Sequence, residues 1–246
     1  MSHFLKRCLL AVTLAMACAP ALADPGYYVV TAYDNEGVRT VDTRYWTVKA
    51  PGSDATLWPE IGLGYGVTSR WYTEVFASFI GSWDTAQKLN SVNWQNEVLL
   101  TQGQYPFDLA LHASWIRTHG YEPGNTLEIG PVLQTEIGRI QINGNVFFER
   151  SWSAEGPQEP TQMKYQWQLR YHWMPLLNVG LQGFGELGTW DDWSARDQQS
   201  HRAGPALFGT WHMADGHTLQ YQAAYLFGST YGQNGSMFSM RVQYGF

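Results

Sequence analysis

One short stretch of the sequence carries residue types that could hydrolyse an ester. His112 and Ser114 stand two positions apart, so both side chains face the same side of an extended strand. Nucleophilic catalysis needs such a serine within hydrogen-bond reach of a histidine, together with an acid that orients the histidine. Asp108 shares the face but lies about 13 Å from His112, four residues at ~3.3 Å each. The pair alone is weak support for an enzyme, and the sequence favours a polar strand face without catalysis.

The sequence lacks the residues that thiol, metal or nucleotide chemistry would need. Both cysteines, Cys8 and Cys18, lie near the start of the chain, in a segment that we expect to be removed. No spacing of His, Asp or Glu is that of a metal site, and the glycines of GLGYGVTSR do not form a phosphate loop before a helix. A net charge of −6 does not fit a nucleic-acid partner, which requires clustered basic residues. We therefore expect no cofactor, no metal and no nucleic-acid partner.

The elements that must position the polar residues are strands with alternating character. In residues 161–173, TQMKYQWQLRYHW, apolar and aromatic side chains alternate with polar ones, which is the period of a β-strand with two different faces. Aromatic residues make up 15% of the chain and charged residues only 15%, with 25 glycines, whereas an ordinary globular domain has about 25% charge. This composition is typical of a bacterial outer-membrane barrel, in which only every second residue is apolar.

Short turns alternate with longer polar loops along the chain, as in such barrels. The sequence therefore predicts an all-β fold, a transmembrane antiparallel up-and-down barrel of about twelve strands, with ten or fourteen as alternatives. The expected strands cover roughly 38–50, 55–66, 71–82, 91–102, 107–117, 125–137, 139–150, 161–173, 177–188, 201–212, 216–228 and 236–246.

The two ends of the chain indicate where in the cell the protein is located. Residues 1–23 combine Lys6 and Arg7 with an apolar run and an A-x-A motif ending at Ala23, the pattern of a cleaved secretory signal peptide. Residues 24–37 do not fit the even strand count and are expected to be a periplasmic arm, a plug in the lumen or an extra edge strand. The barrel itself is expected over residues 38–246. Its last strand ends on Phe246, and this resembles the terminal aromatic strand that the barrel-assembly machinery reads in bacterial outer-membrane proteins.

The polar parity of the strands should line the lumen, and it contains most of the charged residues. Each charge could brace neighbouring strands as an ion pair, as Glu149 could with Lys164, or Arg170 with Glu186. Alternatively, basic residues on later strands could face acids on earlier ones and create a transverse field across a narrow pore. The candidates for lumen-lining residues are Glu74, Glu97, Asp108, His112, Glu128, Glu136, Glu149, Lys164, Arg170, His172, Glu186, Arg202, His212 and Arg241.

One hairpin carries a more specific resemblance. Residues 61–79, IGLGYGVTSRWYTEVFASF, resemble the YGLTDR-x-E hairpin of the phenol-degradation (MetA-pathway) outer-membrane proteins. Tyr65, Gly66, Thr68, Arg70 and Glu74 match that pattern, while Val67 and Ser69 replace Leu and Asp. The resemblance implies an outer-membrane channel or transporter-like protein and carries over neither a substrate nor a binding residue.

Three functions follow from the sequence as hypotheses. The first is a channel or transporter-like barrel of the cell outer membrane for small solutes, including hydrophobic or aromatic ones. The second is an occluded structural or interaction barrel, because a barrel of twelve strands lies between those filled by side chains and those with an aqueous channel. The third is a lipid-modifying outer-membrane enzyme. The expected partners are outer-membrane lipid, the barrel-assembly machinery and a small-molecule solute.

Overall fold

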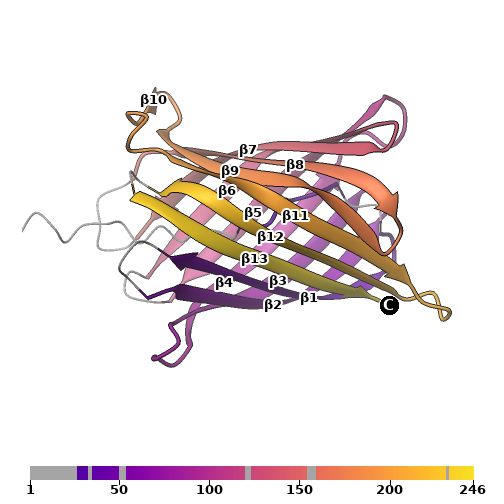
Figure 1. The fold of residues 1–246 in the computed structure, drawn as a ribbon, viewed down its shortest axis with the longest axis horizontal. Coiled ribbons are helices and arrows are strands. Elements are labelled where there is room, and N and C mark those ends of the chain that lie inside the picture. Colours follow the sequence, from indigo (N-terminus) through magenta and orange to yellow (C-terminus); the bar gives the residue numbers. More distant parts are fainter. Residues whose placement is uncertain (1–26, 33–34, 50–53, 120–122, 154–158, 231–232) are drawn as a thin grey trace, which may run out of the picture.

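A computed structural model describes residues 27–32, 35–49, 54–119, 123–153, 159–230 and 233–246, and the expected signal peptide with its cleavage point at Ala23 lies outside these ranges. The described residues form one antiparallel sheet of twelve long strands and one two-residue strand, closed on itself as a barrel (Figure 1). The strands are β1 (Arg39–Lys49), β2 (Thr56–Thr68), β3 (Trp71–Ile80), β4 (Lys88–Leu99), β5 (Phe107–Thr118), β6 (Gly124–Ile137), β7 (Ile140–Trp152), β8 (Gln162–Met174), β9 (Leu177–Thr189), β10 (Asp192–Trp193), β11 (Ser200–His212), β12 (Thr218–Thr230) and β13 (Gln233–Gly245). The prediction of an all-β barrel with twelve main strands is confirmed.

Closure occurs between the first and last strands. β13 pairs with β1 in antiparallel register from Thr40 opposite Gly245 to Lys49 opposite Ser236. Phe246 extends this seam, because its backbone N–H donates to Arg39 O at 2.9 Å and its O accepts from Arg39 N at 3.0 Å. A closed barrel leaves no strand edge unpaired, and this is a requirement for a sheet in lipid.

The two-residue alternation decides which side chains face outward. On β5, Leu111 and Trp115 are exposed while Ala110, His112 and Ser114 are buried. Exposed outward residues along other strands include Leu63, Trp94, Leu133 and Leu181. The outer surface is thus a belt of apolar side chains, as lipid contact requires, and the interior receives the opposite parity.

Exposed tryptophans gather near strand ends, among them Trp71, Trp115, Trp173 and Trp211. Their amphipathic rings are suited to the two membrane–water interfaces. In the described part of the chain, no helix is long and apolar enough to cross a membrane.

The connections differ between the two ends of the barrel. One end carries the short turns, such as residues 138–139 and 213–217, and also the C-terminal residue, at the right of Figure 1. The other end carries the longer connections, including residues 190–199 with β10, at the left of Figure 1.

Candidate functional site

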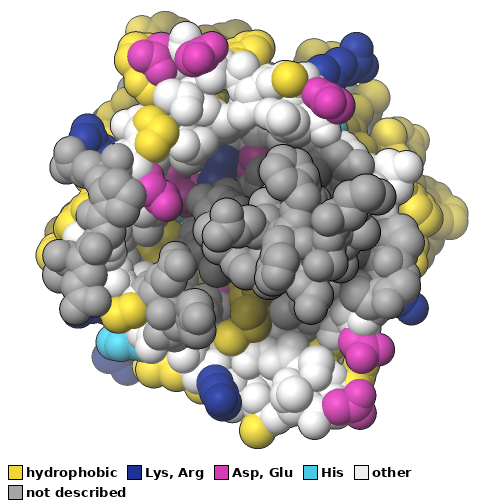
Figure 2. All heavy atoms as spheres, turned by 90° about the vertical axis from the view of Figure 1, so that its left-hand side faces the viewer, with side chains coloured by type: hydrophobic (Ala, Val, Ile, Leu, Met, Phe, Trp, Pro, Cys, Tyr) yellow, Lys and Arg dark blue, Asp and Glu magenta, His cyan; other side chains and the backbone are white. Residues whose placement is uncertain are grey.

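The interior of the barrel is the part of the molecule that concentrates polar groups. Viewed from the end that carries β10, the wall surrounds a hollow in which basic and acidic side chains are visible (Figure 2). Many buried side chains of the wall are charged or carry amides, among them Glu74, Glu97, Gln95, Asn143 and Gln168. A soluble β-sandwich would fill such a space with aliphatic residues. A polar interior inside an apolar belt is the arrangement of a membrane barrel with a lumen.

The structure places the sequence-predicted residues at three levels of exposure. Buried inside the wall are Glu74, Glu97, His112, Glu128, Glu149, Lys164, Arg202 and Arg241. Half-buried are Asp108, Arg170, His172 and Glu186. Glu136 and His212 are exposed, because they lie at the end of β6 and β11 beside the short turns, where the lumen meets water. His172 Nε2 lies 3.7 Å from Glu136 Oε1 at the same end.

The densest group of interior charges includes three residues that the sequence analysis did not name: Asp42, Arg44 and Glu60. Arg44 lies 2.8 Å from Asp42 and 2.5 Å from Glu74, while Glu60 is 4.0 Å away. Arg241 completes the group at 2.5 Å from Asp42 across the β1–β13 seam. Thr40, Asp42 and Arg44 are alternate residues of the expected strand 38–50 and share one face. The alternation of that strand therefore predicts that Asp42 and Arg44 face the lumen together.

His112 is held between two carboxylates. Its Nδ1 lies 2.9 Å from Glu97 Oε1 and its Nε2 lies 3.1 Å from Glu128 Oε1. Ser114 Oγ is buried and has no hydrogen-bond partner among the described residues. Both ring nitrogens of His112 are therefore engaged by acids, and the imidazole does not activate Ser114.

The ion pairs follow the strand register. The predicted pair between Lys164 and Glu149 is confirmed, with 2.6 Å between Nζ and Oε2. The suggested pair between Arg170 and Glu186 is wrong. The residue opposite Glu186 on β8 is Lys164, so Arg170 lies six residues away, about 20 Å along the strand.

Glu186 instead pairs with Arg202 at 3.9 Å, and the Arg170 guanidinium lies 4.4 Å from the ring centroid of Phe208. Since Lys164, Arg202 and Arg241 each lie beside an acid of a neighbouring strand, the hypothesis of a separate basic stripe facing distant acids is wrong for these three residues.

Residues 27–32 lie inside the barrel and belong to none of its strands. Tyr27 donates its hydroxyl to Glu186 Oε1 at 2.8 Å, and the Arg202 guanidinium lies 4.5 Å from its ring centroid. The Tyr27 ring packs edge-on against Trp46 and Phe184. Its backbone O accepts a hydrogen bond from Ser239 Oγ.

Tyr28 contacts a different part of the wall. Its hydroxyl donates to Gln95 Oε1 at 2.5 Å, and its ring lies 3.9 Å from the Arg44 guanidinium and 5.1 Å from that of Arg241. Such cation–π contacts stabilise a buried ring beside a desolvated guanidinium. Val30 is held through its backbone, with N–H donating to Gln166 Oε1 at 3.0 Å and O accepting from Asn145 Nδ2 at 2.8 Å.

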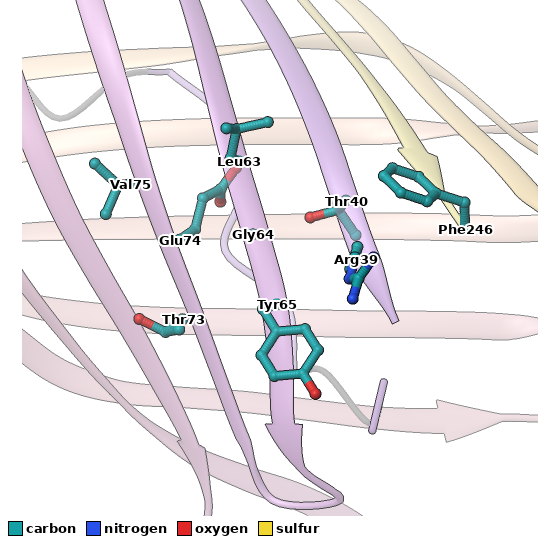
Figure 3. A pocket seen from close by; sticks show the side chains of 9 residues that line it. All are labelled: Arg39, Thr40, Leu63, Gly64, Tyr65, Thr73, Glu74, Val75 and Phe246. Atoms are coloured by element: carbon teal, nitrogen blue, oxygen red, sulfur yellow. The ribbon is translucent and has the colours of Figure 1, made fainter. Parts of the chain in front are cut away.

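The described part of the structure contains one cavity in the interior and a second one on the outer side of the wall. One, of about 40 Å³, lies beside Val29, Thr31 and Arg170. The other, about 390 Å³, lies at β1, β2 and β3 and is lined in part by the exposed outward residues Leu63 and Val75 (Figure 3). The second cavity therefore opens toward the lipid side of the wall. No group of three or more His, Asp or Glu side chains in the described ranges is arranged to hold a metal ion.

Comparison with known proteins gives a likeness of fold. No protein-family model matches the chain, and no curated protein matches it. Among solved structures, the COG4313 outer membrane channel from Pseudomonas putida F1 is similar, with a TM-score of 0.63 and 11% identity over 91% of this chain and 100% of that one. A NanC porin has a TM-score of 0.55 and 12% identity over 84% of this chain and 98% of that one.

The closed antiparallel barrel, its apolar belt and these neighbours define the class of the protein. It is an outer-membrane β-barrel protein, and it resides in the cell outer membrane in contact with lipid.

Proposed function

We propose that the protein is an outer-membrane channel for small solutes. The observation that carries the proposal is the row of buried acidic, basic and amide side chains along the inside of a closed wall, from Asp42 and Arg44 through Glu97 to Lys164. An interior of this kind solvates a polar solute, whereas an apolar filling would exclude it. The similarity in fold to a channel and a porin supports the same conclusion.

The solutes include hydrophobic or aromatic ones in this proposal. Two aromatic side chains, Tyr27 and Tyr28, already occupy positions in the interior that combine a guanidinium face with a hydrogen-bond acceptor. The resemblance of residues 61–79 to the phenol-degradation outer-membrane proteins agrees with this choice and remains part of the proposal.

A second candidate is an occluded structural or interaction barrel. It is favoured by the residues Tyr27–Val30, which are all buried in the interior, and by the ion pairs that brace neighbouring strands. The lipid-modifying enzyme is less supported, because His112 binds Glu97 and Glu128 and lies inside the wall.

The route to the membrane is proposed from the chain ends. Residues 1–23 act as the signal peptide, cleaved after Ala23, and the barrel-assembly machinery reads the strand that ends on Phe246. Removal of Phe246 should reduce the amount of folded barrel in the outer membrane, as measured by heat-modifiable migration in gels. Unchanged assembly would contradict this role.

Reconstitution separates the two candidate functions. Protein in planar bilayers should pass discrete currents, and liposomes that contain it should swell in small solutes at rates that depend on the solute. A correctly folded barrel with neither current nor swelling would overturn the channel proposal and leave the occluded barrel.

Charge selectivity provides a sharper version of the same test. Arg170 lines the small interior cavity beside Val29. Arg170→Glu should therefore make the channel more selective for cations, which is measured as a shift of the reversal potential in a salt gradient. Arg117→Glu is the control, because Arg117 is exposed near the other end of the barrel, where it binds Asn125. Equal shifts in both variants would show that the current does not pass Arg170.

A further inference from the structure

The segment Tyr27–Val30 divides its side chains between two regions of the wall. Tyr27 and Val29 pack in a cluster with Trp46, Phe184 and Phe208, on the β1, β9 and β11 side. Tyr28 and Val30 lie among different wall residues, in a cluster completed by Leu99, Ala110, Val132 and Phe147 on β4, β5, β6 and β7. These two groups of strands are separated in the order of the sheet. The segment therefore bridges the lumen from one side to the other.

Tyr27 and Asn35 contact the wall at different levels of the barrel. Tyr27 contacts Trp46 near one end of β1, whereas Asn35 lies against Gly66, beside the pair of Tyr65 with Arg39 at the other end of β1. Seven residues of β1 separate these two levels, about 23 Å of strand. Tyr27 and Asn35 therefore contact the wall at two levels that lie far apart along β1.

The attachment of the segment differs from that of the wall strands. The hydrogen bonds described above for Tyr27, Tyr28 and Val30 all join the segment to side chains of the wall. These side chains are Glu186, Ser239, Gln95, Gln166 and Asn145. The hydrogen-bond ladders of the barrel are made between strands, without the segment. Withdrawal of residues 27–32 would consequently leave the closed wall intact.

A separate contact anchors the chain between the segment and β1. The N–H of Gly37 donates to Gly66 O at 2.8 Å, the N–H of Gly66 donates to Val38 O at 3.0 Å, and the N–H of Val38 donates to Asn35 O at 3.1 Å. A Cβ on Gly66 would stand 1.6 Å from Asn35 O, so glycine is required for this approach. The anchor fixes one end of the segment at the short-turn end of the barrel.

From this geometry we infer that residues Tyr27–Val30 are a tethered gate, which closes the lumen when docked and opens it when withdrawn, with Tyr27 and Tyr28 as its two latches. The inference rests on the proposed channel function and adds its regulation. The latches are suited to reversible docking, because the hydroxyl of each tyrosine donates to a wall side chain and each ring lies on a wall guanidinium, and neither contact belongs to a strand ladder. A segment that lies outside the strand ladders can open at a fraction of the free energy of global unfolding, because the ladders need not break when it leaves.

The first experiment compares currents in planar bilayers. A variant without residues 27–32 and the double variant Tyr27→Ala/Tyr28→Ala are measured beside the wild-type chain, and Tyr105→Ala serves as control because Tyr105 is exposed in the β4–β5 turn. We expect the open probability to rise roughly tenfold in the first two variants and to stay unchanged in Tyr105→Ala. Equal open probability and equal conductance in all four proteins would overturn the gate and leave the channel standing.

Failure of the channel function has a different signature. If no variant conducts although each barrel is folded by circular dichroism and heat-modifiable migration, the proposed channel is overturned and the gate with it. If the wild type is silent and the deletion conducts, both proposals are supported.

A second experiment follows the segment itself, without a current. Val30→Cys is placed in a chain in which Cys8 and Cys18 are replaced by Ala, and its labelling by a membrane-impermeant maleimide is compared with that of Asp84→Cys in an exposed loop. We expect Val30→Cys to be protected, and its labelling rate to rise about tenfold on adding Tyr27→Ala/Tyr28→Ala. Labelling of Val30→Cys as fast as Asp84→Cys would show an undocked segment and overturn the inference, and so would protection that the tyrosine substitutions leave unchanged.

Discussion

Lys164 Nζ lies 2.6 Å from Glu149 Oε2 on the neighbouring strand, and both side chains are buried in the barrel interior. Removal of one partner leaves the other charge without its counter-ion in a poorly hydrated place, which costs about 3–5 kcal/mol. Lys164→Met should therefore lower the free energy of unfolding by that amount in a reversible urea titration in lipid. Lys88→Met, at the exposed start of β4, should change it by less than about 0.5 kcal/mol. Equal effects would mean that Lys164 is hydrated.

Charged substitutions at two heights on the outer surface test which residues face the lipid. Leu169 lies near the middle of β8 and is exposed on the outer surface, whereas Ile137 is exposed at the last position of β6. Leu169→Arg should lower the free energy of unfolding by about 2–4 kcal/mol, because it places a charge at the midplane of the membrane. Ile137→Arg should lower it by about 0–1 kcal/mol. Both values come from the same unfolding assay. A larger cost for Ile137→Arg than for Leu169→Arg would place the membrane at a different height on the barrel.

The bridge around His112 predicts unequal roles for two neighbouring polar residues. His112→Ala leaves Glu97 and Glu128 buried without the group between them, and we expect a loss of about 3–5 kcal/mol. Ser114→Ala should cost less than about 1 kcal/mol, because Ser114 Oγ has no hydrogen-bond partner among the described residues. Phospholipid vesicles incubated with the wild type should show background hydrolysis only, and hydrolysis that Ser114→Ala abolishes would revive the enzyme hypothesis.

The two ends of the barrel should face different compartments. Arg196 is exposed in the connection that contains β10, and Arg139 is exposed in the short turn between β6 and β7. Long loops of outer-membrane barrels are extracellular and short turns periplasmic. Trypsin added to intact cells should cut after Arg196, and cleavage after Arg139 should need a permeabilised outer membrane. The reverse order, read from fragment masses, would invert the topology.

The barrel could be predicted from the sequence because its signal is local. Alternation such as that of residues 161–173 is set by the pleat of a single strand, and any strand with an apolar and a polar face must meet two different environments. The pair of Lys164 with Glu149 was also within reach, because the two residues lie on consecutive strands joined by one connection. The buried positions of Asp42 and Arg44 follow the same rule, because both share one parity of β1.

The tertiary structure alone decided the register and the contents of the lumen. Arg170 and Glu186 share the inward parity of consecutive strands, but the unbroken ladder from Tyr171 opposite Val179 to Lys164 opposite Glu186 pairs Glu186 with Lys164. Residues 24–37 show no alternation of apolar and polar residues from which a neighbouring strand could be predicted. Tyr28 contacts Gln95, 67 positions away in the chain, and Tyr27 contacts Glu186, 159 positions away. Parity tells which face a side chain takes, whereas such distant neighbours are fixed only when the closed wall brings its strands around one axis.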